Sequence, residues 1–183
     1  MDQFPEFLER IVDEPSLSAD SIQWIEGSDM PLPYRDLLVH KKDMTSTLAN
    51  FHGSKIGLEV LKVETDGGGY VREVILFAES TGNPVEYGAI RIQLDAFKAE
   101  EREAIVAGKE PLGSILNRMH CDYHSRPRGF FSIQAPVVCQ ERFGCSEGET
   151  LYGRYNQLVN GEGKELASII EILPLTEKVG RPE

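Results

Sequence analysis

Four charged residues lie in stretches that otherwise have the composition of buried β-strands. They are Arg72 in YVREVILF, Glu86 and Arg91 in VEYGAIRIQL, and Glu171 in ASIIEILP. Successive side chains of a strand point to opposite faces of a sheet, so some of these charges are expected to point into an apolar interior. A buried charge needs a partner, because isolating it from water costs several kcal/mol even after relaxation.

Two interpretations fit these charges. In the structural one, they form an ion pair such as Arg72 with Glu171, or lie on a solvated face of the sheet. In the chemical one, an arginine binds the carboxylate of a small ligand and a nearby glutamic acid moves a proton. The pattern alone leaves both open.

Two further motifs could hold an anion or a metal. In GKEPLGSIL, residues 108 to 116, a helix is expected to begin at Pro111, and its first-turn N–H groups could bind an anion. An ordinary loop-to-helix junction is the alternative. His120, Cys121 and His124 match no standard zinc spacing and have no partner CxxC, so no metal site is expected.

The surrounding sequence predicts an α+β domain. Helical patterns cover residues 4–13 and 16–26, and a third helix ends at Gly53. Strand patterns cover residues 56–65, 70–78 and 85–94, with turns at DGGG and TGNP between them. Two helices on either side of Gly108 follow, and then strands over residues 129–142, 149–160 and 165–173. This order predicts a single domain with an antiparallel sheet of about six strands.

Composition narrows the function classes. The 183 residues carry a net charge of -11 and no basic stripe, which argues against nucleic acid as a partner but not against a small anion. Three cysteines without a CxxC indicate free thiols in a reducing compartment. The acidic N-terminus has no apolar signal region, and no window is long and apolar enough to span a membrane. We therefore expect a cytoplasmic protein.

Five short pieces resemble one family in their order and spacing. They are Met44 in KKDMTSTL, Arg72 in YVREVILF, the turn at 82–84, PLG at 111–113 and Glu171 in IIEILP. Together they are similar to the chorismate pyruvate-lyase (4-hydroxybenzoate synthase) family over residues 36–174. Residues 1–35 would then be an N-terminal helical extension and residues 175–183 a disordered tail. The resemblance implies a chorismate lyase-like fold, with helical flaps over a buried ligand pocket.

The resemblance also implies an activity and a site. The family eliminates pyruvate from chorismate to give 4-hydroxybenzoate, as a carbon–oxygen lyase without a metal or organic cofactor. Arg72 would anchor the ring carboxylate, together with the backbone at Leu112 and Gly113. Glu171 would act as a general acid near the ether oxygen, and Met44 would line that end of the pocket.

One position departs from the family pattern. Family members carry an arginine directly after the glycine of the third strand, where this sequence has Ala89. Arg91 lies two residues later, on the same face as Ala89, and we expect it to hold the pyruvyl carboxylate of chorismate. Phe130, Phe131 and Tyr155 could either line an aromatic pocket or belong to the core.

A second function class fits the same resemblance. The effector-binding domains of a group of bacterial transcription regulators are similar to this fold, so the alternative is a non-catalytic sensor of small aromatic acids. The sequence shows no helix-turn-helix module, and it contains both Arg72 and Glu171. These two features favour the lyase as the prediction.

Overall fold

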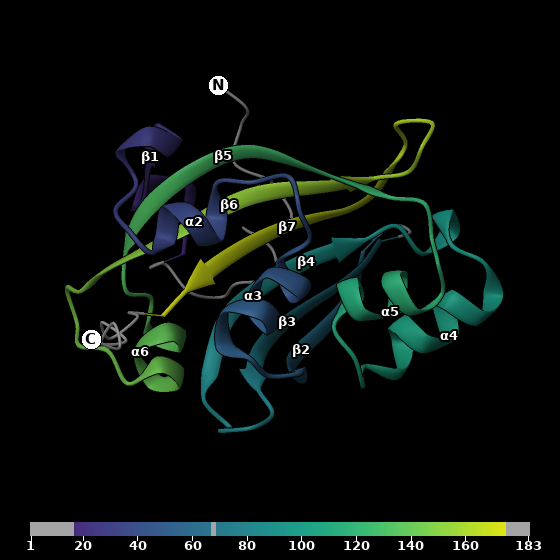
Figure 1. Ribbon diagram of the computed structural model, residues 1–183, viewed down its shortest axis with the longest axis horizontal. Coiled ribbons are helices and arrows are strands. Elements are labelled where there is room, and N and C mark those ends of the chain that lie inside the picture. The colour runs from purple at the N-terminus through teal and green to yellow at the C-terminus, as the bar shows by residue number, and fades with distance from the viewer. Residues whose placement is uncertain (1–16, 67–68, 175–183) are drawn as a thin grey trace.

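A single antiparallel sheet forms the centre of the molecule, with helices on both of its faces (Figure 1). The computed structural model describes residues 17–66 and 69–174. The helix expected over residues 4–13 and the tail expected over 175–183 lie outside the described residues. None of the helices within the described ranges has the length and apolar character that crossing a membrane requires.

The sheet has seven strands in the described ranges, in the order β1-β5-β6-β7-β4-β3-β2. Their bounds are β1 Ile22–Ile25, β2 Ile56–Asp66, β3 Gly69–Ala78, β4 Pro84–Ile92, β5 His124–Gln134, β6 Thr150–Val159 and β7 Glu165–Leu173. The hairpin expected across the DGGG turn is present as the β2–β3 pair, which runs to Asp66 and Gly69. The third expected strand, β4, pairs with both β3 and β7.

The helices are short. Their bounds are α2 Tyr34–Leu38, α3 Met44–His52, α4 Ala99–Ala107, α5 Leu112–Arg118 and α6 Val137–Phe143, with 3₁₀ turns at Ala19–Ser21, Gly27–Asp29 and Leu94–Ala96. The Asp43 side chain caps α3 by accepting a hydrogen bond from the Ser46 N–H at 2.8 Å. Left-handed glycines end α3 at Gly53 and α4 at Gly108.

Two predicted elements are wrong in type. The helix expected over residues 16–26 is a 3₁₀ turn followed by β1, whose Ile22 and Trp24 pair with β5. Tertiary pairing prevails there over the local helical pattern. The strand expected over residues 129–142 ends at Gln134, and α6 begins after Pro136. Proline favours a helix start and removes a donor from a strand ladder, which accounts for the change.

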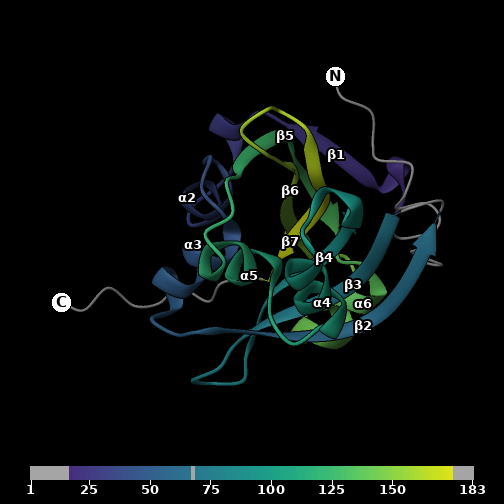
Figure 2. The ribbon, with the colours of Figure 1, turned by 90° about the vertical axis from the view of Figure 1, so that its right-hand side faces the viewer.

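The two faces of the sheet carry different cores. On one face, a cluster that includes Val71, Tyr87 and Ile170 packs against α6. On the opposite face, two clusters lie side by side: one joins the sheet to α2 and α3, and the other joins it to α4 and α5. Figure 2 shows α3 and α5 next to each other over this second face, and the two helices are in contact. The candidate site lies where these two clusters meet.

Candidate functional site

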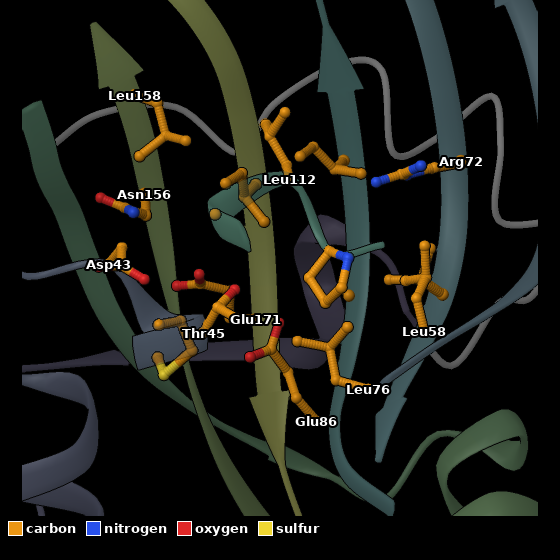
Figure 3. A pocket seen from close by; sticks show the side chains of 17 residues that line it. Asp43, Thr45, Leu58, Arg72, Leu76, Glu86, Leu112, Asn156, Leu158 and Glu171 are labelled. Atoms are coloured by element: carbon orange, nitrogen blue, oxygen red, sulfur yellow. The ribbon is translucent and has the colours of Figure 1, made fainter. Parts of the chain in front are cut away.

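A cavity separates the sheet from α3 and α5, at the junction of the two clusters (Figure 3). Its volume is about 60 Å³, measured as the space open to the centres of water molecules. The residues that line it are Asp43, Met44, Thr45, Leu58, Arg72, Val74, Leu76, Glu86, Gly88, Ile90, Pro111, Leu112, Gly113, Asn156, Leu158, Ile169 and Glu171. The lining is mostly apolar with a few charged groups, as is typical of small-molecule sites.

Arg72 reaches into the cavity from β3, and its side chain is 1% exposed. Its Nη1 donates a hydrogen bond to the carbonyl oxygen of Ile105 at 3.1 Å. Its Nε is buried and has no hydrogen-bond partner among the described residues. Burial lowers the pKa of this guanidinium, but arginine still keeps its charge. The cavity therefore contains a cation whose donors are only partly used.

Glu171 enters the same cavity from β7 and is paired with an arginine that does not line it. Arg154 lies directly opposite Glu171 on β6 and is completely buried. Its Nε donates to Oε2 of Glu171, and its Nη2 donates to Oε1 at 3.4 Å. The paired glutamate is itself 3% exposed. The ion pair postulated between Arg72 and Glu171 is thus formed by Arg154 instead.

Arg154 also holds the segment between α2 and α3. Its Nη1 donates to the carbonyl oxygens of Leu38 and His40, both at 3.2 Å. The His40 ring is half buried, and burial, followed by the positive charge of Arg154, lowers its pKa. One guanidinium therefore connects a cavity carboxylate to a loop that lies above the sheet.

Glu86 is a second buried carboxyl in the cavity. It is 4% exposed, and its Oε2 has no hydrogen-bond partner among the described residues. Gly88, two residues further along β4, pairs with Glu171 across the β4–β7 ladder, so the two glutamates are close neighbours (Figure 3). Burial raises the pKa of Glu86 well above its ordinary value; the charge of Glu171 raises it further and Arg154 lowers it.

The structure brings most of the predicted site residues together. Met44, Arg72, Leu112, Gly113 and Glu171 all line the cavity. They come from α3, β3, α5 and β7, which are far apart in the sequence. Whether they bind a ligand stays a prediction, but their convergence on one cavity is a structural fact.

Arg91 is the exception. It pairs with Val71 and Ser168 in the ladder, and these residues face the opposite side of the sheet from Arg72. The expectation that it holds a ligand carboxylate in the same pocket needs a correction, because the face of Ala89 is the core face and not the cavity face. Phe131 and Tyr155 belong to that same core, and Phe130 does not line the cavity either.

Sequence reasoning missed two members of the site. Arg154 was not singled out, and Glu86 was noted as a charge but not as a site residue. The sequence gives only a weak signal for Arg154, which shares one face of β6 with Tyr152 and Asn156. Around the cysteines, Cys121 Sγ donates to Glu101 at 3.3 Å, and His120 and His124 are exposed. No group of three or more His, Cys, Asp or Glu residues is placed to hold a metal within residues 17–66 and 69–174.

Comparison with known proteins identifies the fold. No protein-family model and no curated protein matches the sequence. The structure resembles PhnF from Mycobacterium smegmatis with a TM-score of 0.58 and 9% identity, covering 74% of this chain and 65% of PhnF. The match to the separate effector domain of PhnF has a TM-score of 0.55 and 9% identity, covering 72% of this chain and 88% of that one. The chain thus spans less than two thirds of full-length PhnF.

A third solved structure gives the same result. It is the possible transcriptional regulator YydK from Bacillus subtilis, with a TM-score of 0.53, 10% identity and coverage of 89% of this chain and 77% of that one. At these identities the likeness establishes the fold alone. The chain is a single α+β domain with a seven-stranded antiparallel sheet and the chorismate lyase-like fold.

The prediction of a carbon–oxygen lyase is wrong. The matched structures are an effector domain and a regulator, and none of those described above is named as an enzyme. The site gives a physical reason as well. The carboxyl of Glu171, which was expected to donate a proton, is engaged by both Nε and Nη2 of Arg154.

Proposed function

We propose that the chain is a non-catalytic binding domain for a small carboxylic acid, and that it acts as a sensor of that acid. The observation that carries the proposal is Arg72, a buried arginine with an unpartnered Nε inside an apolar cavity. A planar carboxylate fits such a guanidinium, because two parallel N–H donors can reach its two oxygens.

The dimensions of the cavity support a compact ligand. A water molecule needs roughly 10–15 Å³ of such space, so about 60 Å³ holds roughly four waters, and a ring-sized ligand would enter only as α3 and α5 move away from the sheet. Val74, Ile90 and Leu158 supply apolar walls for such a ring. We therefore assign the ligand to the aromatic or other single-ring acids, with the ring between the sheet and Leu112 of α5.

The fold supports a binding role. The chain covers most of an effector domain, and the cavity lies under short helices that could move without breaking the sheet. The binding unit that we propose includes residues 36–174 together with β1, because β1 completes the sheet beside β5. The regulatory output of this domain would come from helices α3 and α5, which cover the cavity.

Ligand-induced stabilisation tests the proposal. The melting temperature of the purified protein would be followed with benzoate, with 4-hydroxybenzoate and with uncharged benzamide as the ligand control. A ligand present at about 100 times its Kd stabilises the folded state by about 2.7 kcal/mol. We expect stabilisation by the acids but not by benzamide, and recovery of the acids chemically unchanged.

Two matched variants locate the binding group. Arg72→Gln should weaken acid binding about 10- to 100-fold, the usual value of a hydrogen bond to a charged group. Arg91→Gln removes an arginine from the next-door strand on the opposite face, and should leave the affinity unchanged. Equal binding of benzamide, or retained affinity in Arg72→Gln, would refute the proposal.

A further inference from the structure

The second carboxyl of the cavity, Glu86, has no assigned partner for one of its oxygens. The charged groups that face it are Glu171 from β7, Arg154 from β6 and, across the cavity, Arg72 from β3. Asp43 also lines the cavity, but its Oδ1 already accepts the capping hydrogen bond of α3. Arg154 is occupied by Glu171 and by two loop carbonyls. This end of the cavity therefore has one carboxyl more than its cations can pair.

The opposite end has the reverse imbalance. Arg72 has an unpartnered Nε, and no carboxylate of the described residues forms an ion pair with it. Arg72 lies opposite Ile90, and Glu86 lies four residues earlier on the same strand. Four residues of a strand span about 13 Å, which sets the separation of the two ends along β4. Figure 3 shows Arg72 and the two glutamates at different ends of the cavity.

The floor between the two ends is the backbone of β4 at Gly88. Gly88 lies between Ile90 and Glu86 on the cavity face of β4, and it has no side chain to fill the space. A Cβ at this position would lie 3.1 Å from Cγ2 of Val74 and 3.3 Å from Oε1 of Glu86. The Val74 and Glu86 side chains thus already crowd the space directly above Gly88, and a molecule that links the two charged ends would pass beside them along β4.

We infer that the cavity binds a small zwitterion, with its carboxylate on Arg72 and its ammonium group on Glu86 beside Glu171. This inference rests on the proposed function and names the ligand class of that same site. An ammonium group offers three N–H donors and one positive charge, which matches the excess of one carboxyl. A neutral end group would leave Glu86 protonated and would gain no charge pair with it.

The inference has a consequence for protons. Because burial, and then Glu171, raises the pKa of Glu86, the empty cavity holds a proton on this carboxyl at pH values where an exposed glutamate is ionised. The ligand ammonium replaces that proton, so binding releases about one proton. The affinity for a zwitterion should rise by up to about tenfold per pH unit over the pH range in which Glu86 is protonated in the empty cavity and ionised in the complex.

Three acids of nearly equal size separate the alternatives. They are 4-(aminomethyl)benzoate with a cationic end, 4-(hydroxymethyl)benzoate with a neutral polar end and 4-ethylbenzoate with an apolar end. Calorimetric titrations in two buffers of different ionisation enthalpy would give the affinity and the number of protons released. We expect the amine to bind roughly 10- to 100-fold more tightly than the other two acids, with release of about one proton.

Glu86→Gln should abolish that preference and the proton release. Glu73→Gln, which changes a carboxyl on β3 that faces the other side of the sheet, should leave both intact. Equal affinity of the wild-type protein for the amine and for the other two acids would overturn the inference. Binding of the amine to the wild-type protein without proton release would also overturn it. Both tests use the wild-type protein and do not depend on the folding of a variant. If the other two acids still bind in an Arg72-dependent manner, the proposed function survives; if none of the three binds, the proposed function fails as well.

Discussion

Removing Arg154 should destabilise the protein more than removing any other charged side chain of the cavity region. Arg154→Met keeps the apolar stem but removes a guanidinium that makes two contacts to Glu171 and one each to the carbonyls of Leu38 and His40. Breaking a buried ion pair by removing one partner costs about 3–5 kcal/mol. The hydrogen bond to the His40 carbonyl is only partly buried, so water can replace it in the variant, and we expect a loss of about 3–5 kcal/mol in total.

A double-mutant cycle identifies the source of this loss. Arg154→Met combined with Glu171→Leu removes both charges and leaves no unpaired buried ion. Replacing a whole buried pair by apolar residues is often neutral or stabilising, so the double variant should be more stable than Arg154→Met by about 2 kcal/mol or more. A surface control is Arg118→Met, which breaks the exposed pair with Glu110 at 2.9 Å and should cost at most about 1 kcal/mol.

Urea unfolding would compare five proteins: the wild type, Arg154→Met, Glu171→Leu, the double variant and Arg118→Met. Trp24, the single tryptophan, packs edge-to-face on Phe131 with ring centroids 5.8 Å apart, so its fluorescence reports the core beside β1. Far-ultraviolet circular dichroism would report the sheet, and an unchanged slope with denaturant would show that stability itself has changed. A loss below about 1 kcal/mol in Arg154→Met, or a double variant as unstable as the sum of the single variants, would refute the assigned role of the pair.

Two further predictions concern the cavity floor and its second carboxyl. Above pH 4.5 the wild type should lose unfolding free energy, because the raised pKa of Glu86 makes the native state bind a proton that the unfolded chain releases. Glu86→Gln lacks this loss, so its unfolding free energy relative to wild type should rise with pH by at most about 1.4 kcal/mol per pH unit. A pH-independent difference in unfolding free energy would contradict this prediction. Gly88→Ala should fold with a loss of about 1 kcal/mol or less, because only side-chain atoms are crowded, yet bind acids more weakly. Gly153→Ala should lose about 3 kcal/mol or more by thermal unfolding, because its Cβ would collide with the Glu171 carbonyl and the Phe131 ring; equal stability of the two alanine variants would refute this assignment.

The parts of the site that the sequence revealed are those that look anomalous in one strand. Arg72 and Glu171 each interrupt an apolar run, and such a charge is visible without a fold. Arg154 is not anomalous in TLYGRYNQLV, where polar residues are frequent. Its pairing with Glu171 depends on the register between β6 and β7, and the sequence of the connecting residues 160–164 does not determine that register.

The error at Arg91 has a different cause. Period-two alternation correctly placed Arg91 on the face of Ala89, but both faces of β4 are apolar, so alternation cannot say which one meets the cavity. The antiparallel sheet and the successive pairing of β2, β3 and β4 followed from the same alternation and the glycine-rich turns, whereas the pairing of β4 with β7 did not. β1 and α6 did not, because β1 is stabilised by pairing with β5 and α6 is decided by Pro136.

Arg154 also gives a physical reason why the proposed binding domain would not catalyse elimination. A general acid must present its proton to the leaving atom, and here both oxygens of Glu171 accept hydrogen bonds from one guanidinium. Moving Arg154 away from that carboxyl would also break its hydrogen bonds to the Leu38 and His40 carbonyls, and the segment between α2 and α3 would lose these contacts. The same connection suits a sensor, since a ligand group that contacts Glu171 acts on the guanidinium that holds this segment in place.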